Sequence, residues 1–400
     1  MRQKLLFISS HGLADETLQG GHLVAYLHLE ELAKWSDVYC ICLRNPLEAK
    51  ESYQKIQTLC RQVIFLDLCA SKKLLNALSH PNLPIFFSMR YSKTLLRLIS
   101  SLVNTHQIER VHLEWAHLSA LSKTLKALCP QIKLSLFSAD IISDDIKNLC
   151  LSSSGLKRLF WKWDYARTIA FERKHYPLFD RLYVVGKEDR LKLLNYKIPP
   201  EKIMILPTPF GIHGQPRKRN LPSNNEPLNI VFWGAYSRYQ NVHGALYLID
   251  QLFPEIQKIV PQAKIIILGS NPPKNLKEKA APNIEITGFV KDPSPYFEKA
   301  HLAIMPLPYG AGIKVKVLEC LGLGLPVMTN PVGAENVDAT ENDGLYVCTE
   351  IQAYLNALEK LLNEPSHYEA LSQAALDWAK KMIEDFPEKM RSVLEDSLRD

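Results

Sequence analysis

The sequence of 400 residues lacks the features that mark several classes of protein. It has no run of about 18 apolar residues, so we expect no transmembrane helix. Its eight cysteines contain no C-x-x-C pair, so we expect reduced thiols, a cytoplasmic location and no structural zinc. No G-x-G-x-x-G follows the first strand, and Ser9 and Ser10 lack a G-x-S-x-G context, which argues against a dinucleotide-binding oxidoreductase and a serine hydrolase. The net charge of +6 is modest and does not indicate a nucleic-acid partner.

Two stretches of the chain share one plan, in which an apolar strand, a polar loop, an amphipathic helix and a second strand follow each other. They span residues 5–43 and 228–269. Each stretch is typical of the opening of a doubly wound parallel sheet. We therefore predict an α/β fold of two Rossmann-like domains that face a central cleft, because such sheets bind ligands at the carboxyl ends of their strands.

The composition of the chain sets the predicted domain boundaries. The segment 213–227 is rich in Pro, Asn and Arg, which favours a linker between domains. We predict an N-terminal, acceptor-binding domain at 1–212, a C-terminal, donor-binding domain at 228–380, and a helix at 381–400 that packs back on the N-terminal domain. Pro387 is expected to kink or break that helix. Further strands are predicted at 62–66, 110–113, 133–138, 181–185, 284–286, 302–305, 326–329 and 344–347.

The most informative segment runs from Pro306 to Glu319. Two glycines, Gly310 and Gly312, follow a short apolar strand and lead into a helical pattern. The unpaired N–H groups at the start of a helix suit a phosphate, and glycines allow a diphosphate to approach the backbone. Lys316 and Glu319 are three residues apart and share one helix face. From this spacing alone, a nucleotide-sugar site and an ordinary surface helix are both open.

Five ordered segments in the C-terminal half carry a resemblance to a known family. They are Val231-Phe-Trp-Gly-Ala-Tyr with Asn241, Ala263–Gly269, Ile286-Thr-Gly-Phe-Val-Lys-Asp292, Gly310–Glu319 and Gly324–Glu335. Their order and spacing resemble the donor domain of retaining glycosyltransferases of the GT-B fold, specifically glycosyltransferase family 4 (glycosyl transferases group 1). The N-terminal half resembles the family more faintly.

The resemblance implies an enzyme that moves a sugar from a nucleoside diphosphate sugar to a glycan, lipid-linked or other hydroxyl acceptor, with retention. It also implies a role in cell-surface polysaccharide biosynthesis, and it implies no metal or other cofactor, since lysines neutralise the leaving diphosphate. The implied catalytic residues are Lys316, Asp140 and His117. The implied donor-binding residues are Gly234, Arg238, Phe289, Gly310, Ala311, Gly312, Lys314, Lys316, Glu319 and Glu335. The implied acceptor-binding residues are Gly20, Gly21 and His112.

Three positions depart from the pattern of the family. Ala311 stands where many members carry a glutamate, Asn241 stands at a lysine-like position, and Ala139 and Asp140 stand where relatives often place a histidine near the reacting sugar. His112, His117 or Asp140 are the candidates to supply that contact. Two alternatives therefore stay open, a non-catalytic nucleotide-sugar-binding partner of another transferase and a sugar epimerase on the same fold.

A run of basic and aromatic residues lies at 157–174. One interpretation is a surface for a membrane or an anionic glycan, which would add peripheral membrane contact to the partners of the protein. The other is an amphipathic helix that packs its aromatic rings on a core, because Trp161 and Tyr165 are spaced i, i+4.

Overall fold

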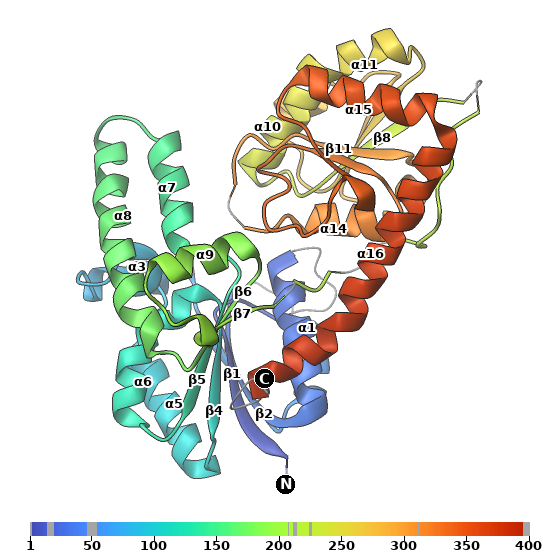
Figure 1. Ribbon diagram of the computed structural model, residues 1–400. Helices are drawn as coiled ribbons and strands as arrows, with labels where there is room; N and C mark the ends of the chain where they lie inside the picture. The colour runs from blue at the N-terminus through green and yellow to red at the C-terminus, as the bar shows by residue number, and fades with distance from the viewer. Residues whose placement is uncertain are drawn as a thin grey trace. The chain divides into compact units, whose positions relative to one another are not determined.

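The computed structural model of the chain describes residues 2–13, 20–45, 54–206, 208–210, 214–223, 226–310 and 312–394. Internal contacts divide the chain into two compact units. The first comprises Met1–Pro209 together with Asp385–Asp400, and the second comprises Phe210–Glu384. Both units are parallel sheets flanked by helices (Figure 1).

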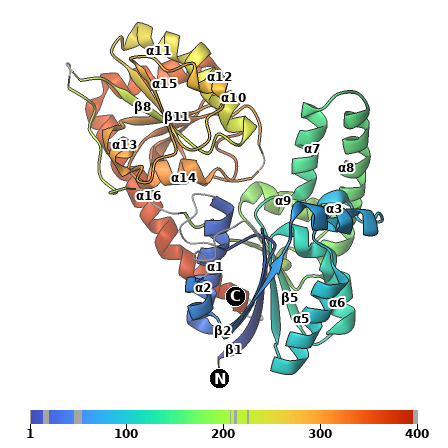
Figure 2. The ribbon, with the colours of Figure 1, turned by 180° about the vertical axis from the view of Figure 1, so that it is seen from behind.

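The first unit is built on a seven-stranded sheet in the order β3-β2-β1-β4-β5-β6-β7, with every neighbouring pair parallel. Helix α1 covers one face of the sheet, and α5 and α6 cover the other (Figures 1 and 2). The strands are β1 (Gln3–Ser9), β2 (Ser36–Arg44), β3 (Gln62–Asp67), β4 (Arg110–Glu114), β5 (Lys133–Ser138), β6 (Arg181–Val184) and β7 (Ile203–Ile205). The α-helices are α1 (Gly20–Trp35), α2 (Gln54–Leu59), α3 (Ala70–Ser79), α4 (Ile85–Ser88), α5 (Lys93–His106), α6 (Ser122–Leu128), α7 (Ile142–Ser152), α8 (Gly155–His175) and α9 (Lys187–Asn195).

The second unit is built on a six-stranded sheet in the order β10-β9-β8-β11-β12-β13, again parallel. The strands are β8 (Asn229–Trp233), β9 (Lys264–Leu268), β10 (Ile284–Gly288), β11 (Leu302–Met305), β12 (Val327–Thr329) and β13 (Leu345–Val347). The α-helices are α10 (Tyr239–Tyr247), α11 (Phe253–Ile259), α12 (Lys274–Lys277), α13 (Ser294–Lys299), α14 (Val315–Gly322), α15 (Ile351–Asn363) and α16 (Pro365–Arg391).

Continuous apolar runs in the sequence explain the central strands. In β1, the four residues from Leu5 to Ile8 are all fully buried, although their side chains alternate between the two faces of the sheet. A parallel sheet with helices on both faces requires this pattern, because neither face is exposed to water. The α/β fold with two doubly wound sheets, predicted from the sequence, is confirmed.

The structure departs from the sequence predictions in three places. Strand β7 was not predicted, because the prolines on either side of it indicate a loop. Helix α16 continues through Pro387 to Arg391, so the predicted break there is wrong. Within 213–227, which was predicted as a linker, Arg219 is buried in the second unit and donates to the carbonyl oxygens of Leu323 and Phe297 at 3.1 and 3.0 Å. The residues from Asp385 onward group with the first unit.

Candidate functional site

The strand order of the second sheet creates a switch point between β8 and β11, where the chain leaves neighbouring strands in opposite directions. Ligands of doubly wound sheets bind beyond the carboxyl ends of the strands at such a point. Gly234 directly follows β8, and the glycine-rich segment that begins at Pro306 directly follows β11 and leads into α14. The predicted donor motif therefore lies at the switch point of its own sheet.

The backbone after β8 is packed too closely for side chains. A Cβ added to Gly269, which has a φ of +142°, would lie 1.9 Å from the carbonyl oxygen of Gly234. A Cβ added to Gly234 would lie 2.9 Å from Nδ2 of Asn241 and 3.5 Å from Nζ of Lys316. Both glycines are therefore needed for the close approach of the β8 loop to Asn241 and Lys316.

Lys316, in the first turn of α14, is held by an amide. Its ammonium donates a hydrogen bond to Oδ1 of Asn241, whose Nδ2 donates to the carbonyl oxygen of Ala235 at 2.7 Å. The second bond fixes the orientation of the amide, so its oxygen faces the lysine. Nζ also lies 5.2 Å from the centre of the Phe232 ring. Asn241, which stands at the lysine-like position of the family, thus orients Lys316.

The environment of Lys316 lowers its pKa to about 7, from an ordinary value of 10.5. Burial is the largest cause, and the positive charges of Lys314 and Arg238 add to it. A cation placed in such surroundings gains more from an anionic ligand than a solvated surface lysine does. This feature favours the phosphate interpretation of the motif over that of a surface helix.

Lys314, also predicted to bind the donor, is paired within the protein. It lies at the N-cap of α14, its ammonium forms an ion pair of 3.1 Å with Glu335, and it also donates to the carbonyl oxygen of Gly312. The charge of Lys314 is therefore already balanced within the protein. Gly310 lies beside the Lys314 stem, because a Cβ added there would be 3.4 Å from Cε. The structure thus groups Gly310, Gly312, Lys314 and Glu335 as the support of the turn.

Glu319, predicted to bind a ribose, is buried on α14, and one of its carboxylate oxygens accepts a 2.7 Å hydrogen bond from Nε1 of Trp233. This bond links α14 to the end of β8. Arg238 is exposed at the start of α10, and Phe289 is 68% exposed after β10. Ala311, where the family often has a glutamate, lies outside the described residues.

In the first unit, Glu114 ends β4 and forms a fully buried pair of contacts. Its two carboxylate oxygens contact Nδ1 of His28 at 3.0 Å and Nε2 of His112 at 3.1 Å. Burial would raise the pKa of Glu114, but the two histidines outweigh this effect and lower it to about 2. Nδ1 of His112 contacts Oγ of Ser135 at 2.8 Å. His112, predicted to bind the acceptor, therefore has both ring nitrogens engaged inside the protein and no exposed surface.

The switch point of the first sheet lies between β1 and β4. Several histidine and tryptophan side chains lie close together at its carboxyl edge. The ring centre of His11 lies 5.4 Å from that of Trp115 and 5.7 Å from that of His117. Nε2 of His11 accepts a 3.1 Å hydrogen bond from Arg90. Burial is the largest cause that holds the pKa values of both His11 and His117 well below the ordinary value.

His11, Arg90 and Trp115 were missed by the sequence reasoning. The signal for His11 was its position directly after the first predicted strand, at the edge where ligands bind. The predicted residues Gly20 and Gly21 form the first turn of α1, and Asp140 is half-buried in the loop after β5.

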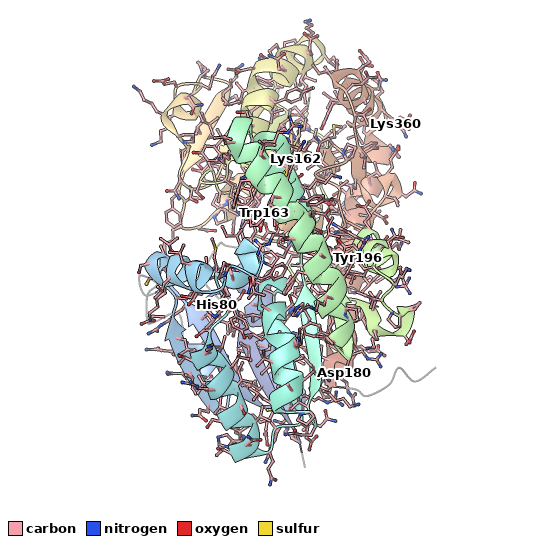
Figure 3. The ribbon with its side chains drawn as sticks, turned by 90° about the vertical axis from the view of Figure 1, so that its left-hand side faces the viewer. His80, Lys162, Trp163, Asp180, Tyr196 and Lys360 are labelled. Carbon is pink, nitrogen blue, oxygen red and sulfur yellow. The ribbon has the colours of Figure 1, made fainter. Side chains whose placement is uncertain are left out.

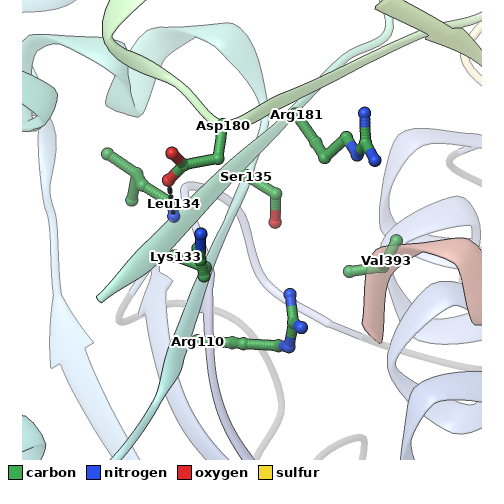
Figure 4. Close-up of a pocket in the computed structure, with 7 residues that line it drawn as sticks. All are labelled: Arg110, Lys133, Leu134, Ser135, Asp180, Arg181 and Val393. Atoms are coloured by element: carbon green, nitrogen blue, oxygen red, sulfur yellow. Dashed lines mark hydrogen bonds between the residues drawn. The ribbon is translucent and has the colours of Figure 1, made fainter. Parts of the chain in front are cut away.

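A small pocket lies at the opposite edge of the first sheet, at the amino ends of β4, β5 and β6 (Figure 4). Its cavity volume is about 30 Å³, far below the several hundred Å³ of ordinary ligand pockets, so it is not a candidate sugar site. Within the described ranges, no group of three or more His, Cys, Asp or Glu side chains is placed to hold a metal, and no helix could cross a membrane.

Comparisons with known proteins address the family and the fold. Residues 227–364 match the family model of the glycosyl transferases group 1. The sucrose-phosphate synthase of Thermosynechococcus elongatus superposes with a TM-score of 0.67 at 14% identity, over 98% of each chain. WaaG, a glycosyltransferase involved in lipopolysaccharide biosynthesis, superposes with a TM-score of 0.64 at 14% identity, over 97% of this chain and 99% of its own.

HepE of Anabaena, solved in complex with UDP, gives a TM-score of 0.64 at 11% identity, over 98% of this chain and 99% of its own. HepE was also solved with UDP-glucose. No curated protein sequence matches the chain. The chain has the GT-B fold, and the match over residues 227–364 supports its interpretation as a glycosyltransferase.

Proposed function

We propose that the protein is a retaining glycosyltransferase of family 4 that uses a nucleoside diphosphate sugar as donor and needs no metal ion. The observation that carries this proposal is Lys316, a half-buried ammonium held by Asn241 at the switch point of the second sheet. Its low pKa means that an anionic ligand is the partner it gains most from. The diphosphate of the donor supplies that anion.

The proposed reaction exchanges one bond at the anomeric carbon. The bond to the diphosphate oxygen breaks, a bond to the acceptor hydroxyl oxygen forms on the same face, and the proton of that hydroxyl passes to the departing diphosphate. Lys316 and the N–H groups at the start of α14 stabilise the charge that develops on the leaving group. We assign Glu319 to the ribose and Asp140 to the reacting sugar, and we place His117 on the acceptor beside it.

Turnover by variants of Lys316 and Glu319 tests this assignment. With UDP-glucose and other nucleotide sugars, we expect Lys316→Ala to lower product formation by about 100-fold, near the loss of one preorganised donor to a leaving group. Lys279→Ala, which removes a surface lysine paired with Asp250, is the matched control and should keep the wild-type rate. Glu319→Ala should weaken nucleotide binding by calorimetry while the fold is kept.

The same experiment separates the alternatives. Wild-type turnover in Lys316→Ala would refute the phosphate assignment. Nucleotide binding without turnover of any donor would identify a non-catalytic binding partner, and incorporation of solvent deuterium into released sugar would identify an epimerase.

We also propose that α7 and α8 contact an anionic membrane surface, where a lipid-linked acceptor is presented. Trp161 and Tyr165 pack on the core cluster that contains Phe87, so the packing interpretation holds for those two rings. On the same helix, however, Leu156 is 85% exposed and Trp163 is 55% exposed. Lys162 lies beside Trp163 (Figure 3), and the exposed set consists of Leu151, Leu156, Lys157, Arg158, Leu159, Phe160, Lys162 and Trp163.

Basic side chains between exposed apolar ones match a surface with anionic headgroups and acyl chains. Co-sedimentation with phosphatidylglycerol vesicles tests this surface. The double variant Leu156→Gln, Trp163→Gln should reduce the bound fraction several-fold, whereas Leu74→Gln, at an exposed leucine of α3, should not. Equal loss in both variants, or no binding by the wild type, would contradict the proposal.

The unbridged cysteines of the chain support a reducing, cytoplasmic compartment.

A further inference from the structure

Arg90 is a buried cation for which the described residues provide no counter-charge. It follows the short helix α4 and is only 8% exposed. Burial lowers its pKa from 12.5 to about 10, so the guanidinium stays protonated at neutral pH. One of its terminal nitrogens donates to Nε2 of His11, and Nε has no hydrogen-bond partner. A buried charge without a paired anion is costly, so such a group implies a ligand.

Another buried arginine shows how this protein treats a structural guanidinium. Arg219 in the second unit is 3% exposed and donates to the carbonyl oxygens of Leu323, Phe297 and Glu298, at 3.1, 3.0 and 3.2 Å. Three main-chain acceptors therefore contact two nitrogens of Arg219, and its other terminal nitrogen has no partner. Arg90 has one acceptor, a histidine nitrogen, so its surroundings differ from those of an arginine that serves only the fold.

The histidine beside Arg90 is neutral and has a defined tautomer. An arginine can only donate, so Nε2 of His11 must accept, and the ring proton lies on Nδ1. Nδ1 then donates to Oγ of Ser10, at a distance of 2.9 Å. His11 therefore adds no positive charge to the cluster, and it does not balance the positive charge of Arg90.

Two further polar atoms at the same edge lack partners. Nε1 of Trp115 and Nδ1 of His117 are both buried and have no hydrogen bond. Both rings surround His11, at 5.4 and 5.7 Å between ring centres. Trp115 also has a φ of +89°, a strained conformation for a residue with a side chain. Such strain is typical of ligand-binding positions.

We propose that Arg90, Trp115 and His117 bind the phosphate group of a phosphorylated acceptor. A phosphate offers several acceptor oxygens, and a guanidinium binds it with charge-assisted hydrogen bonds. The indole N–H of Trp115 donates to a second oxygen, and neutral His117 donates from the nitrogen that now lacks a partner. The ligand lies beyond the carboxyl ends of β1 and β4, at the switch point of the first sheet.

Only the identification of the ligand as the acceptor rests on the proposed function. A phosphate could belong to a soluble sugar phosphate or to a lipid-linked phosphate, and both offer the same chemistry to Arg90. The experiment therefore measures phosphate binding directly and compares the two sources.

The test is calorimetric titration of the full chain with inorganic phosphate, with UDP titrated into the same preparations. We expect saturable phosphate binding that weakens at least 10-fold in Arg90→Gln. Arg61→Gln, which removes an exposed arginine paired with Asp37 in the same unit, should bind phosphate like the wild type. Trp115→Phe keeps an aromatic side chain and removes the indole N–H, so its phosphate affinity should fall several-fold even if Arg90→Gln fails to fold.

Competition then distinguishes the sources. Displacement of phosphate by glucose 6-phosphate supports a soluble acceptor, and displacement by vesicles that contain a polyprenyl phosphate supports a lipid-linked one. Wild-type protein that binds UDP but not phosphate would overturn this inference and leave the proposed function intact. Equal phosphate affinity in the wild type and Arg90→Gln would also overturn it. Failure to bind UDP would instead count against the proposed function.

Discussion

The low pKa of Lys316 predicts that nucleotide binding depends on pH. With a pKa of about 7, the side chain is half protonated at pH 7 and about 1% protonated at pH 9 in the free protein. A bound diphosphate restores the pKa toward its ordinary value of 10.5. UDP affinity should therefore fall about 50-fold between pH 7 and pH 9, or about 2.3 kcal/mol.

The sign of this effect follows from proton uptake. Above pH 7 the free lysine has lost its proton, so binding must take one up, and affinity falls as the pH rises. Calorimetry in buffers of different ionisation enthalpy should show uptake of about half a proton per UDP at pH 7 and about one at pH 9. This range lies above the second pKa of a phosphate, near 6, so the diphosphate of UDP keeps nearly the same charge throughout.

Lys316→Arg is the matched control, because a guanidinium keeps its proton throughout this range. Its UDP affinity is expected to be lower at pH 7, since Asn241 is placed to meet an ammonium, but it should not change between pH 7 and pH 9. A flat profile for the wild type, or an equal slope in Lys316→Arg, would refute the reasoning.

Two further predictions concern a glycine and a buried carboxyl. Gly234→Ala places a Cβ 2.9 Å from Nδ2 of Asn241, so the affinity for UDP should fall about 10-fold. The glycine acts through that amide, so the same substitution in an Asn241→Ala background should cause no further loss of affinity. Burial raises the pKa of Glu172 to about 7 from 4.5, so the stability that this group contributes is fully present below pH 4.5 and is lost as the pH rises to 7. In urea unfolding, the free energy of unfolding of Glu172→Gln should therefore rise by about 2–3 kcal/mol relative to that of the wild type between pH 5 and pH 8. A difference between the two proteins that stays constant with pH would contradict this.

The sequence predicted the sheets well, because buried parallel strands have a simple signature. The bounds of β5, Lys133–Ser138, and of β11, Leu302–Met305, agree with the prediction at both ends. Both strands are short apolar runs that end in a polar residue or proline. Strand β7 was missed because its residues, Ile203–Ile205, lie between Pro200 and Pro207, a composition typical of a loop. The helix through Pro387 was misjudged because tertiary contacts of the last turns outweigh the loss of one hydrogen bond.

The candidate site was predictable in position but not in its contacts. The motif from Gly310 to Glu319 has a local signal, since glycines, lysines and a helix start follow each other directly. The bond between Lys316 and Asn241 joins residues 75 positions apart, and the bond between Glu319 and Trp233 joins residues 86 apart. Spacing along one helix cannot reveal such pairs, so the sequence did not show that Asn241 contacts Lys316 or that Glu335 contacts Lys314.

The structure gives these two lysines opposite electrostatic roles. Lys314 is balanced by Glu335, so it contributes a fixed local field and little net attraction for an incoming anion. Lys316 is held by the neutral amide of Asn241, which orients the ammonium without balancing its charge. A lysine at position 241 would instead place a second ammonium beside the first and oppose its protonation. Burial is the largest cause of the low pKa of Lys316, and an amide at position 241 orients this cation without supplying a counter-charge that would replace a diphosphate.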